Sequence, residues 1–280
     1  MRLSTSVAIL ALAACASASP APTPAPRAAP VKPVPATTAA HELAALKAKL
    51  MSADYRGDLP ELGKLRDDVK RYKTDADVGY LACYWSGFAS WRLAINGLNQ
   101  DMKEDELRQH LLHAAADMYS AIKLRDDFAD AYAAAAGING WIIGSMLRTK
   151  DDQDHIAEHA TLAMMLLGRA KALDANNPRV LWIEGGFQLI LGPERGGGQQ
   201  VALATLHKMV AITERARVDP QSPLPDWGRP EALMMVANAH LAGKPPDVAA
   251  ARQAAKAALA LEPDWSYVRD KLIPKIDATP

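Results

Sequence analysis

The most constraining feature of this chain is a helix-like ending that occurs four times. At each place an Ala-rich apolar segment ends at Leu or Val, and polar or proline-containing residues that begin the next helix follow. The four stopping residues are Leu124, Leu173, Val218 and Leu261, which lie 49, 45 and 43 positions apart. Repetition with a period of this size is typical of stacked helical hairpins. Because one hairpin cannot bury its apolar face alone, neighbouring hairpins must pack together. The repeat therefore predicts an all-α fold built of antiparallel helix hairpins.

Composition supports helices and argues against a nucleic-acid partner. Hydrophobic residues make up 49% of the 280 residues, so the chain can bury a sizeable core. Ala and Leu dominate while runs of β-branched residues are scarce, which favours helix over sheet. The 32 basic and 32 acidic side chains balance to a formal net charge of zero. Without a basic stripe, binding to a phosphate backbone has little support.

The first residues have the pattern of an export signal, which we place at residues 1–18. Arg2 gives a positive start, and the apolar stretch 7–14 is too short to span a bilayer as a helix. Two processing alternatives remain open. The sequence LAAC ending at Cys15 resembles a bacterial lipobox, which predicts lipidation of Cys15. The following ASA resembles an ordinary cleavage site before Ser19.

Residues 19–40 are rich in Pro and Ala, a composition that favours an extended, unpacked chain. We predict a disordered stalk there. A stalk beside Cys15 fits a lipid anchor that holds a folded domain, residues 41–277, away from a membrane. The expected location is the periplasm or the outer membrane, with the chain exported.

From residue 41 onward the apolar spacing is helical almost throughout. Leu62, Leu65, Val69 and Tyr72 mark one face of an early helix, which Asp58 and Pro60 would start. The proline-rich segment 220–230 is expected to be an extended loop. The other helices are expected at 41–51, 77–95, 103–124, 128–147, 154–173, 178–191, 199–218, 230–241, 247–261 and 266–276.

Small residues recur at equivalent points of the first helices. Ser86, Gly137 and Gly186 share one offset when the segments are aligned on the repeat. Helices that cross closely need a small residue at the crossing point. We therefore expect large side chains at Gly137 and Gly186 to destabilise the hairpin contacts.

These endings resemble the tetratricopeptide repeat. The cleanest matches are ALALEPDW at 258–265 and AKALDANNPRVL at 170–181, and the resemblance covers 76–277, more weakly 41–75. The period of 43–49 residues is longer than the family's usual 34 or so. The resemblance implies a right-handed superhelix with a concave groove that binds a protein or peptide. The loop PERGGG at 193–198 also resembles envelope lipoproteins that associate with TRAP-type solute transporters.

Inner helices of such superhelices line the concave face, and this implies five candidate groove contacts. They are Trp85, Arg92, Asn139, Trp141 and Gln188. The tryptophans are spread over the hairpins, and each has an alternative role as a packing anchor between layers.

One motif suggests an enzyme. His155, Glu158 and His159 form H-x-x-E-H, the inverted zinc-peptidase motif, and Glu231 lies near the place of a third ligand. The segment 154–173 also aligns with an ordinary second helix of a repeat, which would place both histidines on a solvated face. Because the motif lacks its structural context, we predict no metal, no cofactor and no catalytic residue.

The remaining motifs have simple structural interpretations. Besides Cys15 the chain has only Cys83, which we expect to be a small buried hydrophobe. His110 and His113 are spaced to share a helix face but lack further ligands. The glycines at 196–198 could cradle an anion, but a flexible turn fits their surroundings better.

Three functions from different classes follow. The first is a noncatalytic scaffold of the bacterial envelope that binds a protein or peptide in a groove. The second is a solute-handling lipoprotein beside a transporter, distinguished by an enclosed apolar pocket with a few convergent polar groups. The third is a zinc metallopeptidase, which a metal analysis of purified protein would exclude.

Overall fold

The structure is a computed structural model that describes residues 34–150 and 153–280. All regular secondary structure in these residues is helical, and they contain no strand, which confirms the predicted all-α class. The predicted signal at 1–18, Cys15 and most of the predicted stalk at 19–40 lie outside the described residues. Among the helices that the structure describes, none is both long and apolar enough to cross a membrane.

The helices follow the predicted order with small shifts at their ends. The first begins three residues earlier than expected and runs five residues further, to a left-handed Gly57. The elements are α1 (Thr38–Arg56), α2 (Leu59–Lys70), α3 (Gly79–Leu98), α4 (Glu104–Leu124), α5 (Ala129–Thr149), α6 (Gln153–Asp174), α7 (Pro178–Ile190), the 3-10 turn η1 (Pro193–Arg195), α8 (Gln199–Arg215), α9 (Arg229–Leu241), α10 (Val248–Leu261), the π-helical turn η2 (Val268–Leu272) and α11 (Ile273–Asp277).

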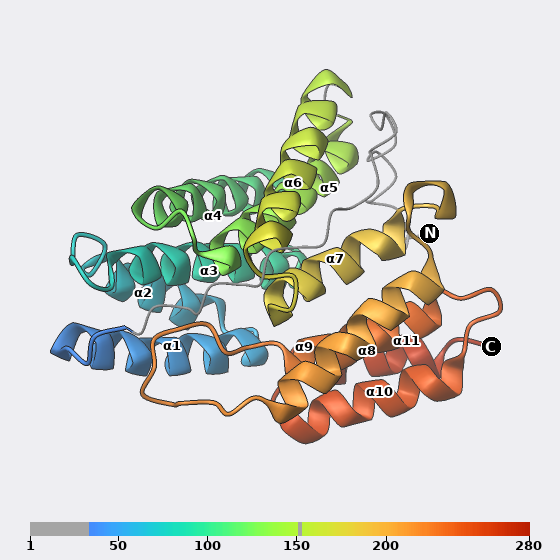
Figure 1. The fold of residues 1–280 in the computed structure, drawn as a ribbon. Helices are drawn as coiled ribbons and strands as arrows, with labels where there is room; N and C mark the ends of the chain where they lie inside the picture. Colours follow the sequence, from blue (N-terminus) through green and yellow to red (C-terminus); the bar gives the residue numbers. More distant parts are fainter. Residues whose placement is uncertain (1–33, 151–152) are drawn as a thin grey trace.

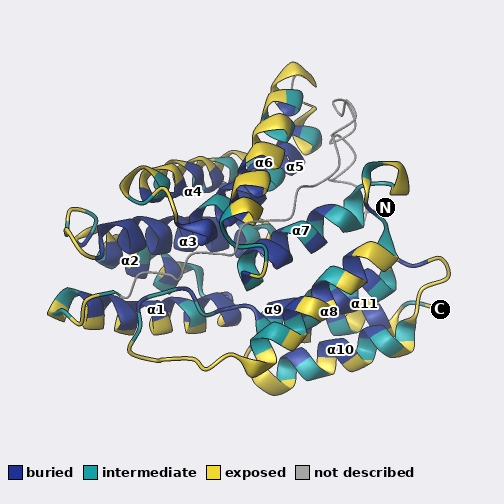
Figure 2. Cartoon of the chain, in the orientation of Figure 1, coloured by how far each residue is buried: buried dark blue, intermediate teal, exposed yellow. Residues whose placement is uncertain are grey.

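Consecutive helices pack as antiparallel hairpins, in the order that the repeat predicts (Figure 1). The pairs are α1 with α2, α3 with α4, α5 with α6, α7 with α8, and α9 with α10. The first helices also contact one another in series, from α1 to α3, α5, α7 and α9. These first helices are the more buried members. In Figure 2 α3 is dark blue almost throughout, while α6 is yellow along its outer side.

Local capping explains several helix starts. The Asp58 carboxylate accepts a hydrogen bond from the backbone N–H of Glu61 at 3.1 Å, with Pro60 in the first turn. Asn177 and Asp247 cap α7 and α10 in the same way. A side-chain oxygen at this position satisfies backbone donors that the helix itself leaves unpaired. The start predicted at Asp58 and Pro60 is therefore confirmed.

Close helix approaches occur at several glycines, and two of them bear on the predicted crossing points. A Cβ atom at Gly137 in α5 would collide with Ile183 of α7, so this position is tight, but the close contact lies between successive hairpins and not within one as predicted. In α7 the tight position is Gly185, where a Cβ would lie 2.8 Å from Cδ2 of Leu206. At Gly186 a Cβ would make only an ordinary contact, 3.4 Å from Met235. The tight position of α7 lies one residue before the predicted one, because Gly185 faces α8, and the effect of a large side chain at Gly186 stays a prediction.

The row of hairpins closes on itself, because α1 also packs against the C-terminal third of the chain. Nζ of Lys47 lies 2.6 Å from Oδ2 of Asp226. The Tyr55 hydroxyl donates to Oε1 of Glu231 at 2.6 Å, and the rings of Tyr55 and Trp265 lie 5.1 Å apart, centre to centre. We call these three pairs the closure contacts. They join residues about two thirds of the chain apart in sequence.

Residues 216–228, which we call the inner segment, lie outside α8. Residues 216–221 are exposed, whereas Pro223, Pro225 and Trp227 are buried in the core. The prediction extended the helix to Val218, whereas α8 ends at Arg215 and the backbone is extended from Ala216. The segment is the long orange coil that crosses α1 in Figure 1. Its Pro223 carbonyl accepts from Nε1 of Trp85 at 2.7 Å. Nε1 of its Trp227 donates to the Tyr84 hydroxyl at 3.0 Å.

The inner segment therefore fills the side of α3 that was expected to line a groove. Trp227 is only 6% exposed and packs near the rings of Phe88 and Trp182. Nη1 of the Arg179 guanidinium also donates to the Trp227 carbonyl at 3.3 Å. Aromatic packing and satisfied polar groups both hold the segment in place.

Candidate functional site

A buried polar cluster lies where α1, α3 and α9 meet. Oδ1 of Asp54 accepts from Nε of Arg92 at 2.6 Å and from Nδ2 of Asn96 at 2.8 Å. All three side chains are buried. Removing one partner of a buried ion pair leaves an uncompensated charge, which is strongly destabilising. The cluster therefore holds α1 against α3 beside the closure contacts.

Glu231 is a buried carboxylic acid beside the polar cluster. Burial raises the pKa of its carboxyl group to about 7. The hydrogen bond from Tyr55 lowers this pKa and offsets only part of the rise. Burial and the neighbouring Glu231 together raise the pKa of Tyr55 well above its usual range. The Tyr55 hydroxyl therefore remains a donor, and Glu231 changes charge near neutral pH.

A small enclosed cavity lies beside this cluster. It has about 10 Å³ of space for the centre of a water molecule, which is room for roughly one water. Three lining side chains carry a buried polar atom without a protein partner: Nε1 of Trp91, Nε1 of Trp182 and Oε2 of Glu231. The lining residues are Asp54, Phe88, Trp91, Arg92, Trp182, Trp227 and Glu231.

The structure does not bring the five predicted groove residues to one open face. Trp85 is fully buried against the inner segment, and Arg92 is paired with Asp54 at the cavity. Asn139 is also fully buried. Trp141 and Gln188 are half-buried, and Oε1 of Gln188 is one of the buried atoms without a partner. The buried residues are packing and pairing groups. The inner segment covers Trp85 and lies beside Arg92, whereas Asn139 is bonded to Ala135 and Tyr119.

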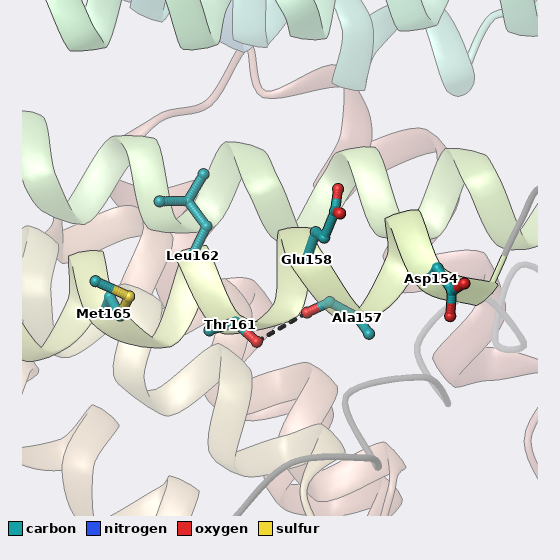
Figure 3. Close-up of a pocket in the computed structure, with 6 residues that line it drawn as sticks. All are labelled: Asp154, Ala157, Glu158, Thr161, Leu162 and Met165. Carbon is teal, nitrogen blue, oxygen red and sulfur yellow. Dashed lines mark hydrogen bonds between the residues drawn. The ribbon is translucent and has the colours of Figure 1, made fainter.

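The outer side of α6 exposes two large apolar side chains among polar ones. Leu162 is 36% exposed and Met165 is 67% exposed. Figure 3 shows them with their neighbours on successive turns of the helix. These residues line a shallow hollow of about 550 Å³. We call this surface the α6 face, and its residues are Asp154, Ala157, Glu158, Thr161, Leu162 and Met165. The spacing of three and four residues places them on one side of the helix.

Asn139 has a role that was not predicted, since it orients His159. Its Nδ2 donates to the Ala135 carbonyl at 2.8 Å and to the Tyr119 hydroxyl at 2.9 Å. Because a carbonyl can only accept, the amide orientation is fixed and Oδ1 faces Nδ1 of His159, 2.7 Å away. Partial burial lowers the pKa of His159, so its ring is neutral at pH 7. Nδ1 therefore carries the proton, and Nε2 keeps its lone pair.

The metallopeptidase set is not assembled. Glu231, the suggested third ligand, is buried against Tyr55, whereas His155 and Glu158 are exposed on α6. In residues 34–150 and 153–280, no group of three or more His, Cys, Asp or Glu side chains is placed to hold a metal ion.

Two other motifs have the structural roles that the sequence suggested. Cys83 is buried, and burial raises the pKa of its thiol, which opposes formation of the reactive thiolate. The glycine loop is a closed turn. The backbone N–H of Gly198 donates to the Gln188 carbonyl at 2.7 Å, and those of Gly196 and Gly197 donate within the turn. These amides are occupied by the turn.

The sequence analysis did not single out Lys47, Tyr55 or Asp54, and it gave Arg92 and Glu231 other roles than pairing with them. Lys47 and Asp54 lie among apolar residues of α1, and Glu231 follows Pro230 at the start of an apolar helix. A charge on an apolar face was the available signal, since a buried charge needs a partner. The partners could not be read from it, because they lie 38 to 179 residues away in the chain.

Comparison with known proteins gives one limited likeness. No known family model matches the chain. The chain is similar to an iron–sulfur flavoprotein of Methanocaldococcus jannaschii, with 30% identity over 90 residues. That segment is 32% of this chain and 42% of the relative, so it spans less than half of that protein. The chain has only two cysteines, fewer than the four thiolates that such clusters usually take.

Proposed function

We propose that the protein is a noncatalytic helical scaffold that binds a protein or peptide partner at the bacterial cell envelope. The hairpins are tetratricopeptide-like in their serial packing, and we take them to be a short right-handed superhelix closed by the inner segment. Export through residues 1–18, lipidation of Cys15 and a stalk at 19–40 belong to the same proposal. Stable anchoring by lipid requires two or more acyl chains, which a lipobox cysteine would supply.

The observation that carries this proposal is the α6 face. Soluble surfaces often expose single apolar side chains, but contiguous apolar patches are typical of interaction sites. Leu162 and Met165 lie on one side of α6 beside the hollow, and Met164 of the same helix is also 45% exposed. Met side chains adapt to the shape of a partner because they are unbranched and flexible. We place the partner on this outer surface, since the inner segment fills the expected groove.

A matched pair of variants tests the proposal. Met165→Asp puts a charge on the α6 face, whereas Val201→Asp puts the same charge on α8, where Val201 is 42% exposed. We expect Met165→Asp to reduce partner capture from envelope extract at least about tenfold, the effect of losing about 1.4 kcal/mol. Val201→Asp should capture as the wild type does, with both melting temperatures unchanged. Equal capture by both variants would contradict docking on α6.

The enclosed cavity favours a second candidate, a solute-handling component associated with a transporter. Its aromatic walls and convergent polar groups have the character of a ligand pocket. However, a solute larger than water can enter only if Trp227 and the inner segment move away. Candidate solutes should then change the tryptophan fluorescence, because three of the six tryptophans line the cavity. Unchanged fluorescence at saturating solute would exclude this function for that solute.

A further inference from the structure

His155 and His159 share one side of α6 and have the spacing of a two-histidine metal clip. Residues four apart on a helix are neighbours, with Cβ atoms about 5–6 Å apart. His155 is exposed and His159 is half-buried at the base of the pair. Neutral imidazole is a preferred ligand for divalent Cu, Ni and Zn.

The independent observation is the way in which Asn139 holds His159. The orientation of the Asn139 amide is fixed by the Ala135 carbonyl, so its Oδ1 accepts the Nδ1 proton of His159 at 2.7 Å. Asn139 itself is fully buried and also bonded to Tyr119. Histidines that bind metals almost always donate their other ring N–H to a carboxylate, a backbone carbonyl or a water molecule, and the Asn139 amide oxygen takes that place here. The acceptor fixes the tautomer and the ring plane before any metal arrives.

We propose that His155 and His159 form a two-ligand site for a borderline divalent transition-metal ion, with Asn139 as the positioning residue for His159. The metal binds through Nε2 of His159 and the imidazole of His155, and water fills the other coordination positions. Cu²⁺ should bind most tightly, following the order of affinities of nitrogen sites for divalent metals. The negative charge of Glu158, one turn after His155, acts in favour of a cation.

The site is distinct from the metallopeptidase hypothesis, because it has two protein ligands and no assembled third one. It lies one turn before Leu162 of the α6 face. The inference goes beyond the proposed function, since Cu²⁺ binding by the protein alone requires no partner.

The experiment is titration of the full chain with Cu²⁺, followed by calorimetry and electron paramagnetic resonance. We expect one equivalent bound with two nitrogen ligands from protein. His155→Gln and His159→Gln should each weaken this binding by at least about tenfold, the loss seen when supporting groups of metal sites are removed. His113→Gln is the matched control, because His113 is an exposed histidine on α4 and should leave the affinity unchanged.

A second measurement does not depend on any variant. Nitrogen-15 NMR of the metal-free protein should show His159 as the Nδ1–H tautomer, with its Nε2 signal lost on addition of Cu²⁺. Asn139→Leu should weaken Cu²⁺ binding by about 10–100-fold while the ligand set stays the same. The proposal is overturned if both His155→Gln and His159→Gln bind Cu²⁺ as tightly as the wild type, or if His159 carries its proton on Nε2.

Discussion

At the scale of single residues, Glu231 is a buried group whose charge changes with pH near neutrality. Its carboxyl group faces Tyr55 and lies near Asp54 and Arg92, and its pKa is raised to about 7 chiefly by burial. In the unfolded chain the same group titrates near 4.5. The folded state therefore holds this proton more tightly than the unfolded state does.

The sign of the resulting pH dependence follows directly. The contribution of Glu231 to stability is fully present below about pH 4.5 and is lost as the pH rises to and through about 7. The loss is up to about 3 kcal/mol, at 1.36 kcal/mol per pKa unit. Glu231→Gln keeps an acceptor for Tyr55 but cannot titrate. Urea denaturation between pH 4.5 and 8 should show that the free energy of unfolding declines less with pH in the variant than in the wild type. If both decline equally, Glu231 is not the group responsible for the pH dependence.

Residue roles were harder to predict than residue burial. Cys83 was expected to be buried because it lies in an apolar helical stretch, and it is. Trp85, Arg92 and Asn139 were expected at a groove, but each has a partner inside the protein. A single sequence shows which residues are polar or aromatic on a helix. It does not show whether a segment 138 positions away will cover them.

At the scale of elements, helix order, pairing and many boundaries could be predicted, because they depend on local patterns. Asp58 and Pro60 mark the start of α2 through capping, and the period of the apolar residues marks the faces. The inner segment could not be predicted in the same way. Prolines stop a helix locally, but the position of the extended chain depends on contacts with α3 and Arg179.

Neighbouring glycines of α7 give a test of helix packing. Gly185→Ala places a methyl group 2.8 Å from Leu206, and overpacking of this kind costs about 1–3 kcal/mol. Gly186→Ala meets only Met235 at 3.4 Å and gains helix propensity of up to about 1 kcal/mol. Thermal unfolding should show a lower melting temperature for the first variant and an unchanged or higher one for the second. The reverse order would mean that α7 is rotated from its position here.

At the scale of the whole molecule, the closure contacts and the inner segment make the hairpins one closed body. The rings of Trp227 and Trp182 lie 5.6 Å apart, and Trp227 also packs against Phe88 of α3. Regions far apart in the sequence thereby share a core. We therefore expect a partner to bind on the outer surface, at a site such as the α6 face.

Removing the anchor of the inner segment should destabilise the whole fold. Trp227→Ala deletes a side chain that is 6% exposed, and such changes typically cost about 3–5 kcal/mol. Val218→Ala in the same segment changes a side chain that is 60% exposed and should stay within about 0.5 kcal/mol. Chemical denaturation of both variants gives the comparison. Similar stability for the two would show that the segment does not pack as described.

The most direct test of the central claim is a residue-specific map of partner contact in intact cells. A photo-reactive amino acid is placed at Met165 on the α6 face, at Gln188 on the side predicted from sequence, and at the exposed Leu261 as a control. We predict a partner adduct from Met165 and none from Gln188 or Leu261. An adduct from Gln188 with none from Met165 would contradict docking on the α6 face, because it would place the partner on the side of α7 that the sequence predicted.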